Sequence, residues 1–181
     1  MTPTGELMDE HRVIERMLRI ASEAADRLEK GEEVERGLWV SASDFLKNFA
    51  DKCHHAKEEK LLFVKMMERG ISGEVGPIAV MLREHEDGRT HVRKMAELSA
   101  GKLGERDTVE LIKHTRAYVE LLTQHIQKED HVLYPLANQV LTTDDQEYLT
   151  EGFEKVEEEI MGSGTHERYH HMIEEWEAKF A

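Results

Sequence analysis

The sequence predicts an all-α fold, an up-down-up-down four-helix bundle with an additional C-terminal helix. Apolar residues recur at alternating spacings of three and four along nearly the whole chain, which is the period of an amphipathic helix. The 181 residues include three Pro, and the helix-favouring Glu, Lys, Leu and Met are abundant. Short turns between the periodic stretches favour antiparallel neighbours. We therefore expect one domain over residues 1–181, with the bundle at about 6–141 and the extra helix at about 144–180.

The first two bundle helices are predicted from their apolar stripes. The first should run over about residues 6–30 and end near Gly31. Its inward stripe carries one histidine, His11, among apolar residues. The second should run over about residues 33–70, with a break near Ser41.

Gly and Pro bound the remaining helices. The third helix is expected at about residues 77–100, after a Gly- and Pro-containing loop. The fourth is expected at about residues 106–141, where Pro135 predicts a late kink. The segment at about 144–180 follows candidate capping residues and is interrupted around 162–164.

Charge and composition exclude several classes of partner. The formal net charge of -14, with no run of Lys or Arg, argues against nucleic acid and against anionic membranes. No apolar run approaches the roughly 18 residues of a membrane span, and the first residues lack the features of a signal peptide. A single cysteine, Cys53, cannot form an internal disulfide. We therefore expect a cytoplasmic protein.

Two segments repeat one pattern of histidine and acid. In each, a His is followed four residues later by Glu and then by a second acid, and an apolar-aromatic pair closes the segment. The segments are His54–Phe63 and His125–Pro135. Residues four apart stand on one face of a helix, so each segment directs an imidazole and a carboxylate the same way. Together with His11 and His85, they supply the parts of a two-metal site inside a bundle.

Histidines interrupt the apolar stripes of all four predicted bundle helices, and glutamates interrupt two. One His on a helix is more often a surface or hydrogen-bonded core residue than a ligand, so the inference depends on the whole set. Buried carboxylates need a partner, and a metal ion that takes carboxylate oxygen and neutral imidazole provides one. Such donors suit iron, manganese or zinc, and bridging carboxylates favour the first two. The candidate metal ligands are His11, His54, Glu58, His85, His125 and Glu129.

With these motifs, the chain resembles hemerythrin-like proteins, the HHE cation-binding group, over about residues 6–140. The matching elements are Glu10-His11, His54–Phe63, Glu84-His85 and His125–Pro135. The resemblance implies a four-helix bundle and a cofactor of two iron ions with an oxo or hydroxo bridge; manganese and zinc are less favoured. It also implies that His11 and His54 bind one ion, that His85 and His125 bind the other, and that the two glutamates bridge them.

The chain departs from the oxygen-carrying members of that group in two places. Those members have a second His four residues after the third-helix ligand, where this chain has Arg89, which cannot ligate a metal. They have an Asp ligand five residues after the fourth-helix His, whereas the carboxylate here is Glu129, four residues after His125, with Asp130 as the five-residue alternative. The missing imidazole leaves the ion of His85 and His125 with an open position. An open position favours redox turnover over reversible oxygen carriage.

Two further side chains, Arg89 and Tyr118, each have two interpretations, and the others are expected to have no role at the metals. Arg89 is either a solvated helix residue or an ion-pair partner of Glu15 that closes one end of the metal pocket. Tyr118 is either a core residue or a hydrogen-bond partner of a metal-bound oxygen species. Cys53 is expected to be a buried, inert thiol, and His91 is expected off the metal-facing side. We expect four further histidines at polar surface positions: His55, His131, His166 and His170.

The leading functional interpretation is a non-heme di-iron protein acting in oxygen, nitric oxide or peroxide chemistry, or in iron homeostasis. A small diatomic or peroxide ligand would be its partner, and whether it turns this ligand over as an enzyme stays open. The alternative is a metal- or redox-sensing regulatory module without catalysis. A ferritin-like oxidase is disfavoured because such bundles use Glu-x-x-His spacing. A metal-free interaction protein is disfavoured by the interrupted core stripes.

Overall fold

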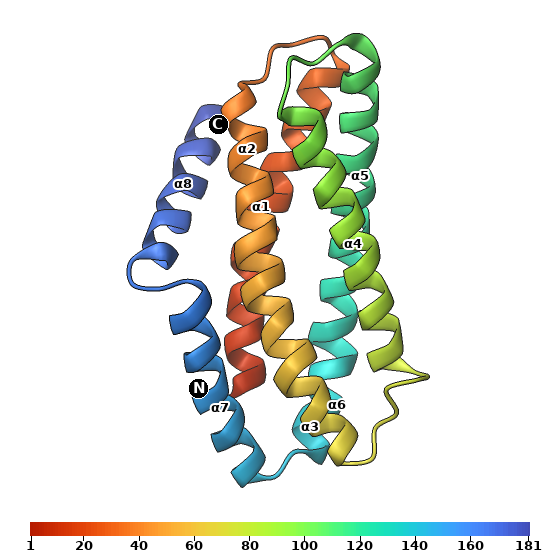
Figure 1. The fold of residues 1–181 in the computed structure, drawn as a ribbon, viewed down its shortest axis with the longest axis vertical. Helices are drawn as coiled ribbons and strands as arrows, with labels where there is room; N and C mark the ends of the chain where they lie inside the picture. Colours follow the sequence, from red (N-terminus) through yellow and green to blue (C-terminus); the bar gives the residue numbers. More distant parts are fainter.

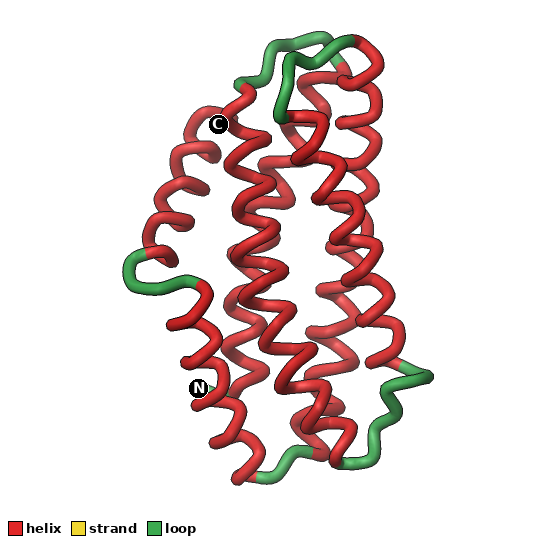
Figure 2. The backbone as a smooth tube through the Cα atoms, in the orientation of Figure 1, coloured by secondary structure: helices red, strands yellow, loops and turns green.

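The computed structural model describes residues 1–181, of which 85% are helical, and it contains no strand. The helices between residues 3 and 140 form four rods, each a single helix or an unbroken run of helical segments. The rods lie side by side along the longest axis of the molecule (Figure 1). The loops that connect them gather at the two ends, and two further helices lie along one side (Figure 2). The predicted all-α helical bundle is confirmed, with a C-terminal addition of two helices.

The first rod is α1 (Pro3–Glu29), which begins a few residues earlier than predicted. The early start is explained by Thr2, whose hydroxyl accepts a hydrogen bond from the N–H of Gly5 at 3.1 Å. Pro3 then occupies the first turn, where its missing N–H has no helical partner to lose. The cap therefore sets the residue at which α1 begins.

The second rod consists of four consecutive helical segments. They are α2 (Arg36–Phe45), the π-helical η1 (Leu46–His55) and η2 (Glu58–Leu62), and α3 (Phe63–Glu68). The predicted break near Ser41 is wrong, because Ser41 lies inside α2 and the buried face of that helix continues through it. The departures from α-helical geometry occur further along, around the first histidine-acid segment.

The third and fourth rods carry the remaining bundle residues. The third is α4 (Pro77–Ser99), and the fourth consists of α5 (Glu105–Lys128), the π-helical η3 (Glu129–Leu133) and α6 (Tyr134–Val140). Pro135 lies in the first turn of α6. The irregularity of this rod is therefore the π-helical turn before Pro135, and the proline starts the helix that follows.

The C-terminal addition comprises α7 (Thr143–Ile160) and α8 (Thr165–Phe180). The predicted interruption is confirmed: Gly162 and Gly164 have φ angles of 65° and 79°, a conformation that glycine adopts without strain. Both helices bury one apolar face against the bundle, through Leu149, Phe153, Tyr169, Ile173 and Trp176.

The interior divides into two apolar clusters with a polar layer between them. The larger cluster contains 23 buried residues and the smaller one 12. In α1, Leu7 belongs to the smaller cluster and Ile14 to the larger, with His11 between them. In α4, Met81 and Met95 stand in the two clusters on either side of His85. One layer of the core, between the two apolar clusters, therefore consists of polar side chains.

No helix combines the length with the apolar character that crossing a membrane requires.

Candidate metal centre

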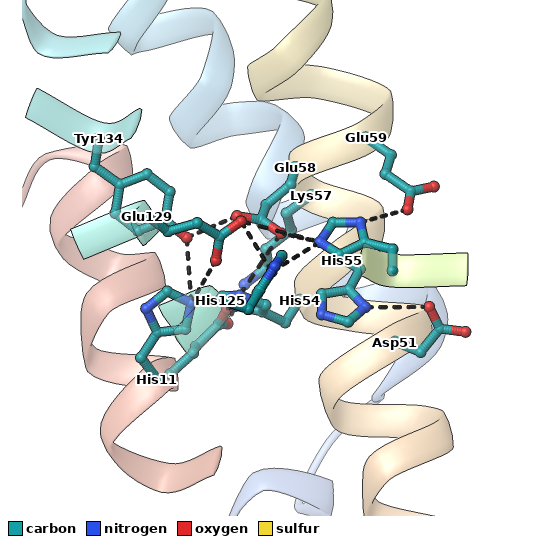
Figure 3. A network of polar contacts seen from close by, with 12 residues as sticks. His11, Asp51, His54, His55, Lys57, Glu58, Glu59, His125, Glu129 and Tyr134 are labelled. Carbon is teal, nitrogen blue, oxygen red and sulfur yellow. Dashed lines mark hydrogen bonds and ion pairs between the residues drawn. The ribbon is translucent and has the colours of Figure 1, made fainter. Parts of the chain in front are cut away.

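The polar layer brings together all six predicted site residues from the four rods. Figure 3 labels His11, His54, Glu58, His125 and Glu129 among them. Each is at most 1% exposed, and the layer comprises His11, His54, Glu58, His85, His125 and Glu129. Ligand-type atoms of His11, His54, Glu58 and Glu129 lie within 4.8 Å of one another. A second group with the same spacing contains Glu58, His85, His125 and one further residue, His55. Glu58 is common to both groups.

The inward-facing atoms lie at the separations expected of neighbouring ligands on one ion. Nε2 of His11 is 3.2 Å from Oε2 of Glu129, and Nε2 of His125 is 3.1 Å from Oε1 of the same carboxylate. Nε2 of His85 lies 3.4 Å from Oε2 of Glu58. Adjacent donors about 3 Å apart are compatible with metal bonds of about 2.1 Å. Glu129 thus reaches toward an imidazole of each group, as a bridging carboxylate must.

Each of the four predicted histidines contacts, through its outer nitrogen, a carboxylate from a different rod. Nδ1 of His54 is 2.7 Å from Glu10, and Nδ1 of His11 is 2.7 Å from Asp130. The remaining two pairs are His85 with Glu59 at 2.6 Å and His125 with Glu84 at 2.8 Å. A carboxylate that accepts the Nδ1 proton leaves the Nε2 lone pair facing inward and fixes the ring orientation. Asp130, the predicted alternative ligand, therefore orients His11.

Four inward-facing atoms have no hydrogen-bond partner although they are buried. They are Nε2 of His54, Oε2 of Glu58 and both carboxylate oxygens of Glu129. A buried polar atom without a partner costs about 1–3 kcal/mol, and a charged one more. In addition, Nε2 of His85 and Nε2 of His125 face each other at 3.1 Å. With both outer nitrogens bound to carboxylates, the two inner nitrogens need either a proton or a metal ion between them. These residues fit a metal ion.

The same electrostatics appear in the pKa values of the imidazoles. Burial alone would lower the pKa of His125, but the nearby charge of Glu129 and the hydrogen bond to Glu84 raise it to about 10. Burial is likewise outweighed at His11, where Asp130 and Glu129 raise the pKa to about 9. For Glu10, burial would raise the pKa, yet His54 and then Lys57 lower it to about 2. The layer as a whole strongly favours positive charge at its centre.

His55 corrects the sequence interpretation, because it belongs to the polar layer and not to the surface. It is 4% exposed, and its ring stacks on that of His85 with centroids 3.9 Å apart. Adjacent residues in an α-helix diverge by about 100°, which led to the expectation that His54 and His55 point apart. Here η1 is π-helical, and its wider turn reduces that divergence. The sequence feature that could have indicated the inward position of His55 is the adjacent pair His54-His55.

Arg89 also differs from both sequence interpretations. Its guanidinium contacts Asp51 at 2.8 Å and Glu59 at 2.7 Å, and it also pairs with Glu86. The predicted pair with Glu15 is wrong: Glu15 contacts Arg12 within α1. Arg89 thus fixes two carboxylates that themselves hold histidines of the layer.

The tyrosine that touches the layer is Tyr134. Its hydroxyl donates to Oε1 of Glu58 at 2.7 Å and lies 3.4 Å from Nε2 of His11. Tyr118, which the sequence drew attention to, is buried in the larger apolar cluster, and burial raises its pKa. By binding one oxygen of Glu58, Tyr134 leaves the other directed at the imidazoles.

Lys57 is fully buried and links the layer to the C-terminal helices. Its ammonium contacts Glu10 at 2.6 Å, Glu6 at 2.7 Å and Glu157 of α7 at 3.2 Å. His166 of α8, predicted at the surface, instead packs its ring edge on Phe49 and lies 3.0 Å from Glu157. The acidic group around Glu10 and Glu157 therefore already has a cation. No sequence pattern singled out Lys57.

The other histidines and the cysteine lie apart from the centre. His131 is exposed and contacts the carbonyl of Gln127, as expected of a surface residue. His91 pairs with His114 on the outer side of α4. Cys53 is buried, and burial raises its pKa to about 12, which fits the predicted inert thiol.

A cavity of about 440 Å³ adjoins the layer between α2, η1, α4 and α5. His55, Gly88, Arg89 and Tyr118 are among the residues that line it. The cavity connects the surface with His55.

A helical bundle that buries histidines and shared carboxylates between its rods belongs to the class of proteins built to hold metal cations. The model of the hemerythrin HHE cation-binding domain matches residues 2–137 of this chain. The chain belongs to that family, which confirms the resemblance read from its motifs.

Curated relatives match most of the chain. Uncharacterized protein Rv1995 of Mycobacterium tuberculosis and uncharacterized protein Mb2018 of Mycobacterium bovis are each 26% identical over 166 residues. The match covers 90% of this chain and 64% of each relative, so the chain spans less than two thirds of their length. No solved structure matches the chain.

Proposed function

We propose that the chain is a non-heme di-iron protein that binds a small oxidant or gas, such as oxygen, nitric oxide or peroxide. The scaffold would be an up-down-up-down four-helix bundle, supported by four rods whose loops gather at opposite ends (Figure 2). The observation that carries the proposal is the set of buried inward atoms without hydrogen-bond partners. They lie among the inner nitrogens of the four predicted histidines, whose outward nitrogens are held by carboxylates.

The proposed ligand roles follow the two groups of the layer. His11 and His54 would hold one ion, and His85 and His125 the other. Glu58 and Glu129 would contribute to both, which would keep the ions a few ångströms apart. Carboxylates and imidazoles without sulfur favour iron or manganese over zinc, and the family favours iron. When bound, an iron pair supplies one-electron redox steps and positions for a small ligand.

The chain's own residues would control access and order around the ions. The apolar clusters above and below the layer exclude bulk water. Tyr134 would hold Glu58 in one orientation through its hydroxyl and could pass a proton to an oxygen of that carboxylate. The cavity beside His55 would admit molecules of diatomic or peroxide size.

Metal analysis tests the proposal directly. Protein reconstituted with Fe(II) without oxygen should hold about two irons per chain, and the oxidised form should absorb in the near ultraviolet. His125→Ala should lose iron, whereas the matched control His131→Ala, at an exposed histidine six residues away, should not. A folded wild-type protein that binds no transition metal would overturn the proposal. Two bound irons without turnover of peroxide or nitric oxide would favour the sensing alternative.

A further inference from the structure

The second group of the layer contains more imidazole than the paired motif of the sequence requires. His55, His85 and His125 all offer a ring nitrogen within 4.8 Å of the others and of Glu58. The first group contains two histidines, His11 and His54. The two halves of the layer are therefore unequal, and His55 is the residue that makes them so.

The surroundings of His55 orient one of its nitrogens toward the layer. Its Nδ1 lies 3.3 Å from Oδ1 of Asp51, one turn earlier in the same rod. That contact leaves Nε2 on the inner edge of the ring, as in the four predicted histidines. The ring of His55 stacks on that of His85 with an angle of 15° between the planes, so one of the two rings must turn for both to bind a single ion. Figure 3 shows His55 and Asp51 on the side of the cluster opposite His11.

Arg89 explains how the arrangement is held in place. It stands one turn after His85 on α4, where an imidazole would reach the same half of the layer. Its guanidinium instead binds Asp51 and Glu59 together. Asp51 contacts His55, and Glu59 contacts His85, so one arginine fixes the carboxylates of both stacked rings. The imidazole that does lie in this half of the layer besides His85 and His125 comes from η1.

We propose that His55 is a third imidazole ligand of the ion held by His85 and His125. The inference rests on the proposed function and assigns to the second ion a donor set of three imidazoles with the bridging carboxylates. The open position would then lie on the ion of His11 and His54, next to the hydroxyl of Tyr134. This reverses the expectation drawn from Arg89, which placed the vacancy on the His85 ion.

The count of imidazoles around iron tests the assignment without any mutation. X-ray absorption of the iron-loaded wild type should fit five imidazoles for two ions. The same measurement on His55→Ala should fit four, with at least tenfold weaker binding of the second iron and unchanged binding of the first. Four imidazoles in the wild type, with equal affinities in His55→Ala, would overturn the assignment. A wild type without bound iron would instead contradict the proposed function.

Chemical rescue separates ligation from a packing role. The cavity beside His55 gives free imidazole a path to the space that His55→Gly would open. Added imidazole should restore the absorption spectrum and the second iron in His55→Gly, and should leave His131→Ala unchanged. Absence of rescue in a folded His55→Gly that has kept both irons would show that His55 only fills space.

Discussion

Glu10 precedes His11 in the sequence, yet its carboxylate holds His54 on the neighbouring rod at 2.7 Å. Glu84 likewise precedes His85 and holds His125. In these pairs the acid beside one predicted ligand orients a ligand on another helix. These contacts connect neighbouring rods at the polar layer, and the orientation of each ring therefore depends on two helices.

Replacing Glu10 with Gln should weaken metal binding without emptying the site. An amide keeps the size of the side chain but loses the charge that fixes the Nδ1–H tautomer of His54. Iron affinity, measured by competition with a coloured chelator, should fall about 10- to 100-fold. Asp9→Asn, at an exposed acid one residue earlier, is the control and should bind iron like the wild type. Equal affinities for the two variants would contradict the orienting role.

Metal removal should lower the thermal stability of the bundle. At a free metal concentration of 100 times the dissociation constant, binding stabilises the folded state by about 2.7 kcal/mol. For a chain of this length, that corresponds to a rise in Tm of roughly 5–10 °C. Calorimetry with iron and with excess chelator should show this difference in the wild type and in the control Glu154→Gln. Glu58→Gln should lose most of it, and a retained shift there would argue against a bridging role.

The fold was largely predictable because each rod buries one helical stripe and every turn except Leu141-Thr142 contains Gly. The end of the first helix near Gly31 and the interruption at 162–164 could be predicted without tertiary information. The π-helical segments could not be predicted. They satisfy the requirement that ring nitrogens and carboxylates reach a common centre, and that requirement arises from contacts between rods.

Contacts between rods also limit which residues of the site could be predicted from the sequence. His11, His54, His85 and His125 share a core-facing phase when α-helical spacing is assumed, so their convergence followed from periodicity. His55 did not follow, because its inward direction depends on a π-helical turn. The orienting carboxylates were visible as acids beside the motifs, but their partners lie on other rods.

Lys57 offers a test of the link between the layer and α7. Replacing it with Met keeps most of the volume but leaves Glu10 buried without its ammonium partner. Removing one partner of a buried ion pair typically costs about 3–5 kcal/mol, so the free energy of unfolding should fall by about 3 kcal/mol or more. Urea unfolding of the metal-free protein measures this. Lys60→Met, at an exposed lysine three residues later, should change it by less than about 0.5 kcal/mol. A small effect at Lys57 would mean that the pair contributes little.

Asp145 should give the stability of the metal-free protein a specific acid dependence. Hydrogen bonds from Arg69, and then from the backbone and side chain of Thr142, hold its pKa well below the ordinary 3.8. Since the folded form binds this proton less readily than the unfolded form, the contribution is fully present above about pH 4. It is lost as the pH falls toward the folded pKa. The stability difference between wild type and Asp145→Asn in urea should therefore shrink between about pH 4 and pH 2. Asp144→Asn, at the exposed neighbouring acid, should show no such narrowing. A difference that stays constant over this range would show that the Arg69 pair does not set the acid response.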